Sequence, residues 1–186
     1  QAGIYAKDNS GTSRMAYVNE QGVETFMGGP GQWEVIAQTV ITTSVASITY
    51  NLTKTYSRIA MAVICATCNS GGSGFLVANL SDDGGVTLVS CRSTIIEEGT
   101  DVVATATLAL IQVSGTPTID LKAEFNRLDK TGPKQFNSMA ARPNSTMWVN
   151  AGQTASCGVI NAIVVANNIP NNIVSGTINL YGLMVT

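Results

Sequence analysis

Residues 72–90 read GSGFLVANLSDDGGVTLVS, and this stretch decides the fold expected for the chain. An apolar run, Phe75 to Leu80, meets the turn sequence Ser81-Asp82-Asp83-Gly84-Gly85, and a second apolar run, Val86 to Val89, follows. Asp-Gly between two β-prone runs indicates a hairpin, because glycine adopts the positive φ angles of a tight turn and Asp can hydrogen-bond its own backbone. The stretch therefore predicts the central hairpin of an all-β domain.

Further β-type stretches surround this hairpin. Apolar residues alternate with polar ones in Val45 to Leu52, and most clearly in Thr118 to Phe125, which predicts half-solvated strands. Tyr56 to Cys68 is apolar at both sets of alternate positions, which predicts a strand in the middle of a sheet with both faces covered. The remaining strands are expected at Trp33 to Ile41, Val102 to Val113, Thr146 to Val149, Val159 to Ala166 and Thr177 to Val185. This succession, without a capped helical period, predicts an antiparallel β-sandwich or barrel.

The composition limits the classes of function. With 186 residues and 45% hydrophobic residues, the chain is long enough for one domain with a real core. Charged residues make up only 12%, about half the usual share, so part of the surface is expected to be covered by partner subunits. The net charge of −2 and a pI of 5.0 give no basic footprint for nucleic acid. No apolar run approaches the ~20 residues of a membrane span, and no signal peptide is evident.

The sequence lacks the usual means of catalysis and metal binding. It has no histidine, the commonest general base and zinc ligand. Cys65 and Cys68 have C-x-x-C spacing, but positions three apart on a strand point to opposite faces, so these two cysteines, with Cys91 and Cys157, are predicted to be small buried hydrophobes. No Ser-x-x-Lys or Gly-x-Ser-x-Gly motif occurs. We therefore expect no enzyme activity, no cofactor and no bound metal.

Two acidic pairs and two tryptophans have alternative interpretations. Asp82 and Asp83 suggest calcium, but the EF-hand spacing is absent and turn chemistry is favoured. Glu97 and Glu98 are adjacent, so they are expected to point apart rather than to flank a sugar as a glycosidase pair. Two tryptophans could stack on a sugar, but a place in the core is favoured because each lies in a β-type run; they are Trp33 and Trp148.

Residues 1–32 are predicted to form an N-terminal arm ahead of a sandwich domain at residues 33–186. Ile4 to Lys7 and Arg14 to Val18 flank a turn-rich segment and suggest a small hairpin, and Gly28-Gly29-Pro30-Gly31 suggests a flexible joint. The arm has too few apolar residues for its own core, so it is expected to dock on a partner; the alternative is that it packs back on its own domain. The candidate docking residues are Tyr5, Arg14, Tyr17, Phe26 and Met27.

Residues 126–144 form the least regular part of the chain and predict a long exposed loop, where binding functions are often found. The candidate ligand-facing residues in and beside it are Lys130, Lys134, Arg142 and Trp148.

The order of features is similar to a known family. Trp33 and Ile36 open the first long strand, Tyr56-Ser57-Arg58-Ile59 follows, and the Leu-Ser-Asp-Asp-Gly-Gly turn spans Leu80 to Gly85. The chain closes with SGTINLYGL at residues 175–183. Over residues 33–186 this resembles the jelly-roll-type β-sandwich of tailed-bacteriophage virion proteins, which include head decoration proteins, head fibres and tail-fibre modules.

The resemblance implies a structural virion protein on the capsid surface, most simply a decoration (cementing) protein that acts by protein–protein binding. Its implied partners are the major capsid protein or other virion proteins, together with further copies of the chain; a trimer is the expected symmetry. The alternative is a receptor- or glycan-binding module of a tail or fibre. The two best-matching motifs, the Ser-Asp-Asp-Gly-Gly turn and the SGTINLYGL ending, are largely structural. They therefore indicate the fold and the virion context better than a specific role.

Overall fold

The computed structural model describes residues 3–9, 12–18, 24–26, 33–68, 74–97, 100–104, 109–113, 118–141, 147–167 and 172–185. Within these residues every strand pair is antiparallel and no α-helix occurs. Accordingly, the described part of the chain has no helix that could cross a membrane.

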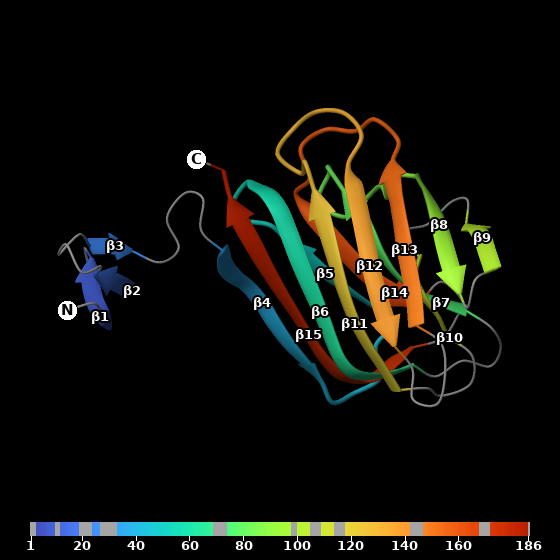
Figure 1. Cartoon of the computed structure of the whole chain (residues 1–186), viewed down its shortest axis with the longest axis horizontal. Helices are drawn as coiled ribbons and strands as arrows, with labels where there is room; N and C mark the ends of the chain where they lie inside the picture. The colour runs from blue at the N-terminus through green and yellow to red at the C-terminus, as the bar shows by residue number, and fades with distance from the viewer. Residues whose placement is uncertain are drawn as a thin grey trace.

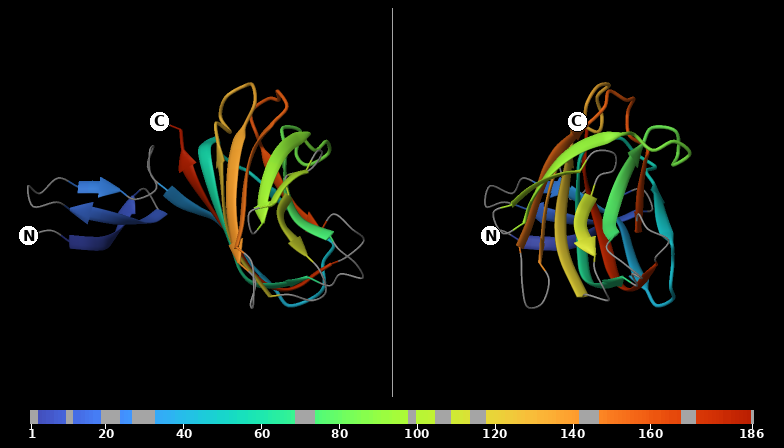
Figure 2. Two further views of the ribbon diagram at one scale, coloured as in Figure 1. Left: turned by 45° about the vertical axis from the view of Figure 1, so that its right-hand side comes forward. Right: turned by 90° about the vertical axis from the view of Figure 1, so that its right-hand side faces the viewer.

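Most of the chain forms two sheets that pack face to face (Figures 1 and 2). The larger sheet has eight strands in the order β4 (Trp33–Ile41), β15 (Ile173–Met184), β6 (Tyr56–Cys68), β11 (Thr118–Asn126), β12 (Gln135–Ala141), β13 (Met147–Thr154), β8 (Cys91–Glu97) and β9 (Thr100–Ala104). The smaller sheet has the order β10 (Ala109–Val113), β7 (Gly74–Ser81), β14 (Ala162–Asn167) and β5 (Ser47–Asn51). The predicted all-β antiparallel sandwich is confirmed; the jelly-roll connectivity stays a prediction.

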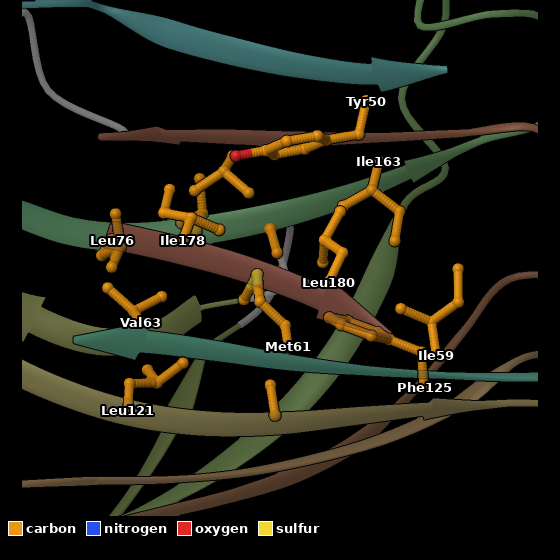
Figure 3. Packing of buried hydrophobic residues seen from close by; sticks show 14 of the residues in the cluster. Tyr50, Ile59, Met61, Val63, Leu76, Leu121, Phe125, Ile163, Ile178 and Leu180 are labelled. Carbon is orange, nitrogen blue, oxygen red and sulfur yellow. The ribbon is translucent and has the colours of Figure 1, made fainter. Parts of the chain in front are cut away.

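The core lies between the two sheets (Figure 3). Alternation along β11 places four apolar side chains inward, each at most 3% exposed: Ile119, Leu121, Ala123 and Phe125. They pack with residues of both sheets, among them Met61 of β6, Leu180 of β15 and Leu76 of β7. Because each large buried side chain contributes about 1.5–3 kcal/mol, this layer is the main source of stability.

Residues 72–90 contain one strand of the predicted hairpin, β7, but not the other. β7 is central in the smaller sheet, yet its neighbours are β10 and β14, and Val86 to Val89 forms no strand. Gly84 and Gly85 both have positive φ, as predicted, but the chain then leaves the sheet as a loop. The hairpin prediction is wrong: β7 pairs with β10 and β14, which are distant in sequence, and Val86 to Val89 contacts it as a loop, through a backbone hydrogen bond from the Val89 N–H to the Leu80 carbonyl over 2.9 Å.

Two other predictions, of a single strand and of a long loop, need correction. The expected single strand from Val102 to Val113 is two strands, β9 and β10, which belong to different sheets. The expected long loop at residues 126–144 contains β12, which alternates between exposed and buried positions. Its inward residues are Phe136, Ser138 and Ala140, and the serine interrupts the apolar alternation that would have indicated a strand.

The N-terminal region forms a separate sheet. β1 (Gly3–Asn9) and β2 (Thr12–Val18) form the predicted hairpin, and β3 (Glu24–Phe26) pairs with β2. None of these three strands pairs with a described strand of the sandwich, and Figures 1 and 2 show the small sheet beside it. The division into an arm and a sandwich domain, and the arm's docking role, stay predictions.

Candidate functional site

The outer face of the eight-stranded sheet, which Figure 1 views directly, has exposed apolar side chains over β4, β15, β6 and β12. We call them the apolar patch: Trp33 (43% exposed), Val35 (65%), Val40 (65%), Ile64 (47%), Met139 (55%) and Tyr181 (37%). Strand register aligns several of them. Val35 lies opposite Tyr181, and Thr177 of β15 lies opposite both Val40 of β4 and Ile64 of β6. The patch therefore follows from strand register rather than from a loop.

The patch corrects the prediction that both faces of β6 are covered. Ile59, Met61 and Val63 point into the core, but Ile64 is exposed on the other face. A strand that is apolar on both faces is typical of a sheet covered on both sides. The described residues cover only one face of the sheet. The outer face of β6 therefore resembles, in its exposed Ile64, the faces that are covered in sheets buried on both sides.

Trp33 lies at one end of the patch and does not fill the core as predicted. The Arg58 guanidinium carbon lies 5.8 Å from the centre of the Trp33 ring, a cation–π contact. Arg58 Nη2 also donates to Glu124 Oε2 over 2.8 Å. The tryptophan, the arginine and the glutamate therefore form a connected group across β4, β6 and β11.

A shallow depression of about 380 Å³ continues the patch across β6, β11 and β12. Ala62 and Ala141 leave room there, and Ile64 and Met139 contribute apolar surface. The charged residues Asp120 and Lys122 of β11 also line the depression, between Ile64 and Met139.

A second, larger depression, of about 670 Å³, lies on the same face over β11, β12, β13 and β8. We call it the amide depression, after its polar side chains: Arg92, Thr94, Asn126, Gln135, Asn137 and Gln153. Register aligns four of them in one row, because Arg92 pairs with Gln153, Gln153 with Gln135, and Gln135 with Asn126. Ala151 and Gly152 are the small residues in its lining.

The loop after β7 uses its polar groups internally. The Ser81 hydroxyl donates to Asp83 Oδ1 over 2.7 Å, and the Thr87 N–H donates to the same oxygen over 2.8 Å. These hydrogen bonds, with the Thr87 N–H first, lower the pKa of Asp83 to about 2. Asp82 Oδ2 accepts from the Gly158 N–H over 2.6 Å, which joins the loop to the segment before β14. Both carboxylates act in turn and loop geometry, as the sequence predicted.

Two cysteines are buried, as predicted, at Cys68 and Cys91, while Cys157 is half-buried. Desolvation raises the pKa of both buried thiols to about 11, so they stay protonated at neutral pH. The side chain of Cys65 lies outside the described residues. Among the described residues no group of three or more His, Cys, Asp or Glu side chains could hold a metal.

The predicted ligand-facing residues are not brought together. Lys134 is fully buried rather than ligand-facing; its ammonium donates to the Lys130 carbonyl and its N–H to Thr154 Oγ1. Lys130 is exposed and forms an ion pair with Asp129 over 2.8 Å. Arg142 and the Trp148 side chain lie outside the described residues.

The predicted docking residues lie on the small N-terminal sheet. Strand pairing aligns Tyr5 with Ala16 and Ala16 with Phe26, whereas Tyr17 pairs with Ile4. Arg14 lies opposite Lys7, and Met27 falls outside the described residues. Pairing thus connects Tyr5 with Phe26 through Ala16.

The sequence reasoning missed both outer-face surfaces. The signal for the amide depression is the alternation of Gln135 and Asn137 with buried neighbours in β12, which the buried Ser138 makes hard to recognise in the sequence. The signal for the apolar patch is the second apolar face of β6. The sequence predicts that this face is covered, whereas Ile64 on it is exposed.

Comparison with protein-family models, curated proteins and solved structures found no match to this chain.

Proposed function

We propose that the protein is a structural component of a tailed-bacteriophage virion, most simply a capsid decoration protein, and that it assembles through the apolar patch with a second copy of itself. The virion context is supported by the resemblance of residues 33–186 described above. The observation that carries the assembly role is the patch of Trp33, Val35, Val40, Ile64, Met139 and Tyr181 on one ordered sheet face.

The residue types of the patch support protein binding. Trp, Tyr, Met and Arg are enriched in the centres of protein interfaces, and Lys and Glu are depleted there. Arg58 is held in place by its contacts with Trp33 and Glu124, so little side-chain freedom is lost when a partner covers it.

The low net charge of the chain, −2, favours a second copy as the partner. Copies with so little net charge repel one another weakly, and a low net charge favours association. The arm at residues 1–32 then remains for contact with the capsid, as the sequence predicts.

The assembly proposal is tested by sedimentation velocity on the full chain over a range of concentrations. Wild type is expected to form oligomers, and Ile64→Lys is expected to weaken association at least about tenfold, because it places an unpaired charge in the contact. The matched control is Leu88→Lys, since Leu88 is similarly exposed (45%) but lies on the loop after β7. A monomeric wild type, or equal effects of the two variants, contradicts the proposal.

The virion context is tested separately by cryo-EM of the particle that carries this protein. Density for the sandwich on the head surface supports a decoration role, and density only at the tail contradicts it.

A further inference from the structure

We propose that the amide depression binds an oligosaccharide that carries an acidic group. This inference goes beyond the proposed assembly function, because it uses other residues on other strands of the same sheet face.

The row of side chains matches the chemistry of a sugar chain. Gln153, Gln135 and Asn126 each present an amide donor beside a carbonyl acceptor, and a sugar hydroxyl is both a donor and an acceptor. The four aligned positions from Arg92 to Asn126 lie on adjacent strands, so they extend over about 14 Å at ~4.8 Å per strand. An extended oligosaccharide laid across the strands would meet them in succession.

These polar groups are not used by the fold. Among the described residues, no hydrogen bond or ion pair engages the side chains of Arg92, Gln135, Asn137 or Gln153. By contrast, the inward-facing polar residues of the same strands, Ser138 and Asn150, are buried and each has an interaction within the protein, although Asn150 Oδ1 has no hydrogen-bond partner. The outward side chains therefore retain their hydrogen-bonding capacity for a ligand.

The shape and charge of the site narrow the class of ligand. Ala151 and Gly152 are the small residues of the lining, and longer side chains border an open depression of about 670 Å³. The lining contains Arg92 and no acidic residue, although the chain as a whole has a net charge of −2. Arginine binds carboxylate, sulfate or phosphate groups with two parallel hydrogen bonds, which indicates an acidic rather than a neutral saccharide.

The test is isothermal titration calorimetry of the full chain with neutral oligosaccharides, with uronic-acid oligosaccharides and with inorganic sulfate alone. Saturable binding of the uronic-acid compounds is expected, with at least about a tenfold loss for Arg92→Gln and for Gln153→Ala. Gln38→Ala is the matched control, because Gln38 is an exposed amide on β4 outside the depression. Equal melting temperatures exclude unfolding as the cause of a loss.

Three outcomes overturn the proposal: no saturable saccharide binding, binding that both depression variants leave unchanged, and sulfate that binds as tightly as the oligosaccharides. Binding of neutral compounds alone overturns the assignment of an acidic ligand. The assembly proposal is unaffected by any of these results, since it depends on Ile64 and not on Arg92.

Discussion

The loop after β7 and the amide depression are both exposed and polar, but they use their polar groups in opposite ways. In the loop, Asp82 and Asp83 accept hydrogen bonds from backbone N–H groups, and Ser81 contacts Asp83 and Gly85. In the depression, the amides point outward and have no partner within the described residues. In the sequence, the adjacent carboxylates suggest calcium although turn chemistry is favoured, whereas the separated amides suggest no site. The contacts of a polar group, and not its charge, therefore show whether the fold already uses that group.

The largest expected difference between the two regions is in the free energy of unfolding when a small residue is replaced by valine. Gly85 has a φ of +91°, and a Cβ there would lie 3.1 Å from Thr49 Cγ2. Gly85→Val is therefore expected to lower the free energy of unfolding by about 1–3 kcal/mol. Ala151→Val, in the exposed strand of the depression, should stay within about 0.5 kcal/mol of wild type. Urea unfolding measures both, and equal effects would break the comparison.

A smaller difference is expected from removing one hydroxyl. Ser81 is fully buried, and its oxygen accepts from the Gly85 N–H over 2.8 Å while donating to Asp83. Ser81→Ala leaves that N–H without its acceptor and should cost about 1–2 kcal/mol. Thr94→Ala removes an exposed hydroxyl from the depression and should change the free energy of unfolding by less than about 0.5 kcal/mol. A Thr94 effect as large as that of Ser81 would show that the depression is part of the structural framework.

The smallest expected effect is a pH dependence confined to the loop. The pKa of Asp83 is lowered in the folded state from 3.8 to about 2, so its stabilising hydrogen bonds are fully present above pH 3.8 and are lost as the pH falls through about 2. The backbone amide signal of Thr87 in an NMR titration should follow this transition, while the side-chain amides of Gln135 and Gln153 should not. Asp83→Asn should abolish the transition, and a midpoint near 3.8 would contradict the role assigned to this carboxylate.

Prediction of the strands succeeded where the apolar and polar pattern of the segment itself indicates its position and burial. Trp33–Ile41 and Tyr56–Cys68 match β4 and β6 at both ends, and β11 has the predicted alternation. It failed where the tertiary structure decides: Val86 to Val89 has the composition of a strand, but β7 pairs with the distant strands β10 and β14, and this segment stays a loop whose Val89 N–H donates to the Leu80 carbonyl. The two outer-face surfaces were missed for the same reason, because the exposure of Ile64 depends on what covers β6.

By itself, the sequence determined the all-β class, most strand positions, the glycine turn after β7 and the burial of Cys68 and Cys91, because backbone preference and alternation are local properties. Only the tertiary structure decided which strands pair, that Val102 to Val113 divides between two sheets, that Lys134 is buried, and that Trp33 lies at the surface. It also aligned Arg92, Gln153, Gln135 and Asn126, which lie between positions 92 and 153 of the chain, in one row. The physical reason is that antiparallel register brings distant residues side by side, and no local pattern records which partner a strand will take.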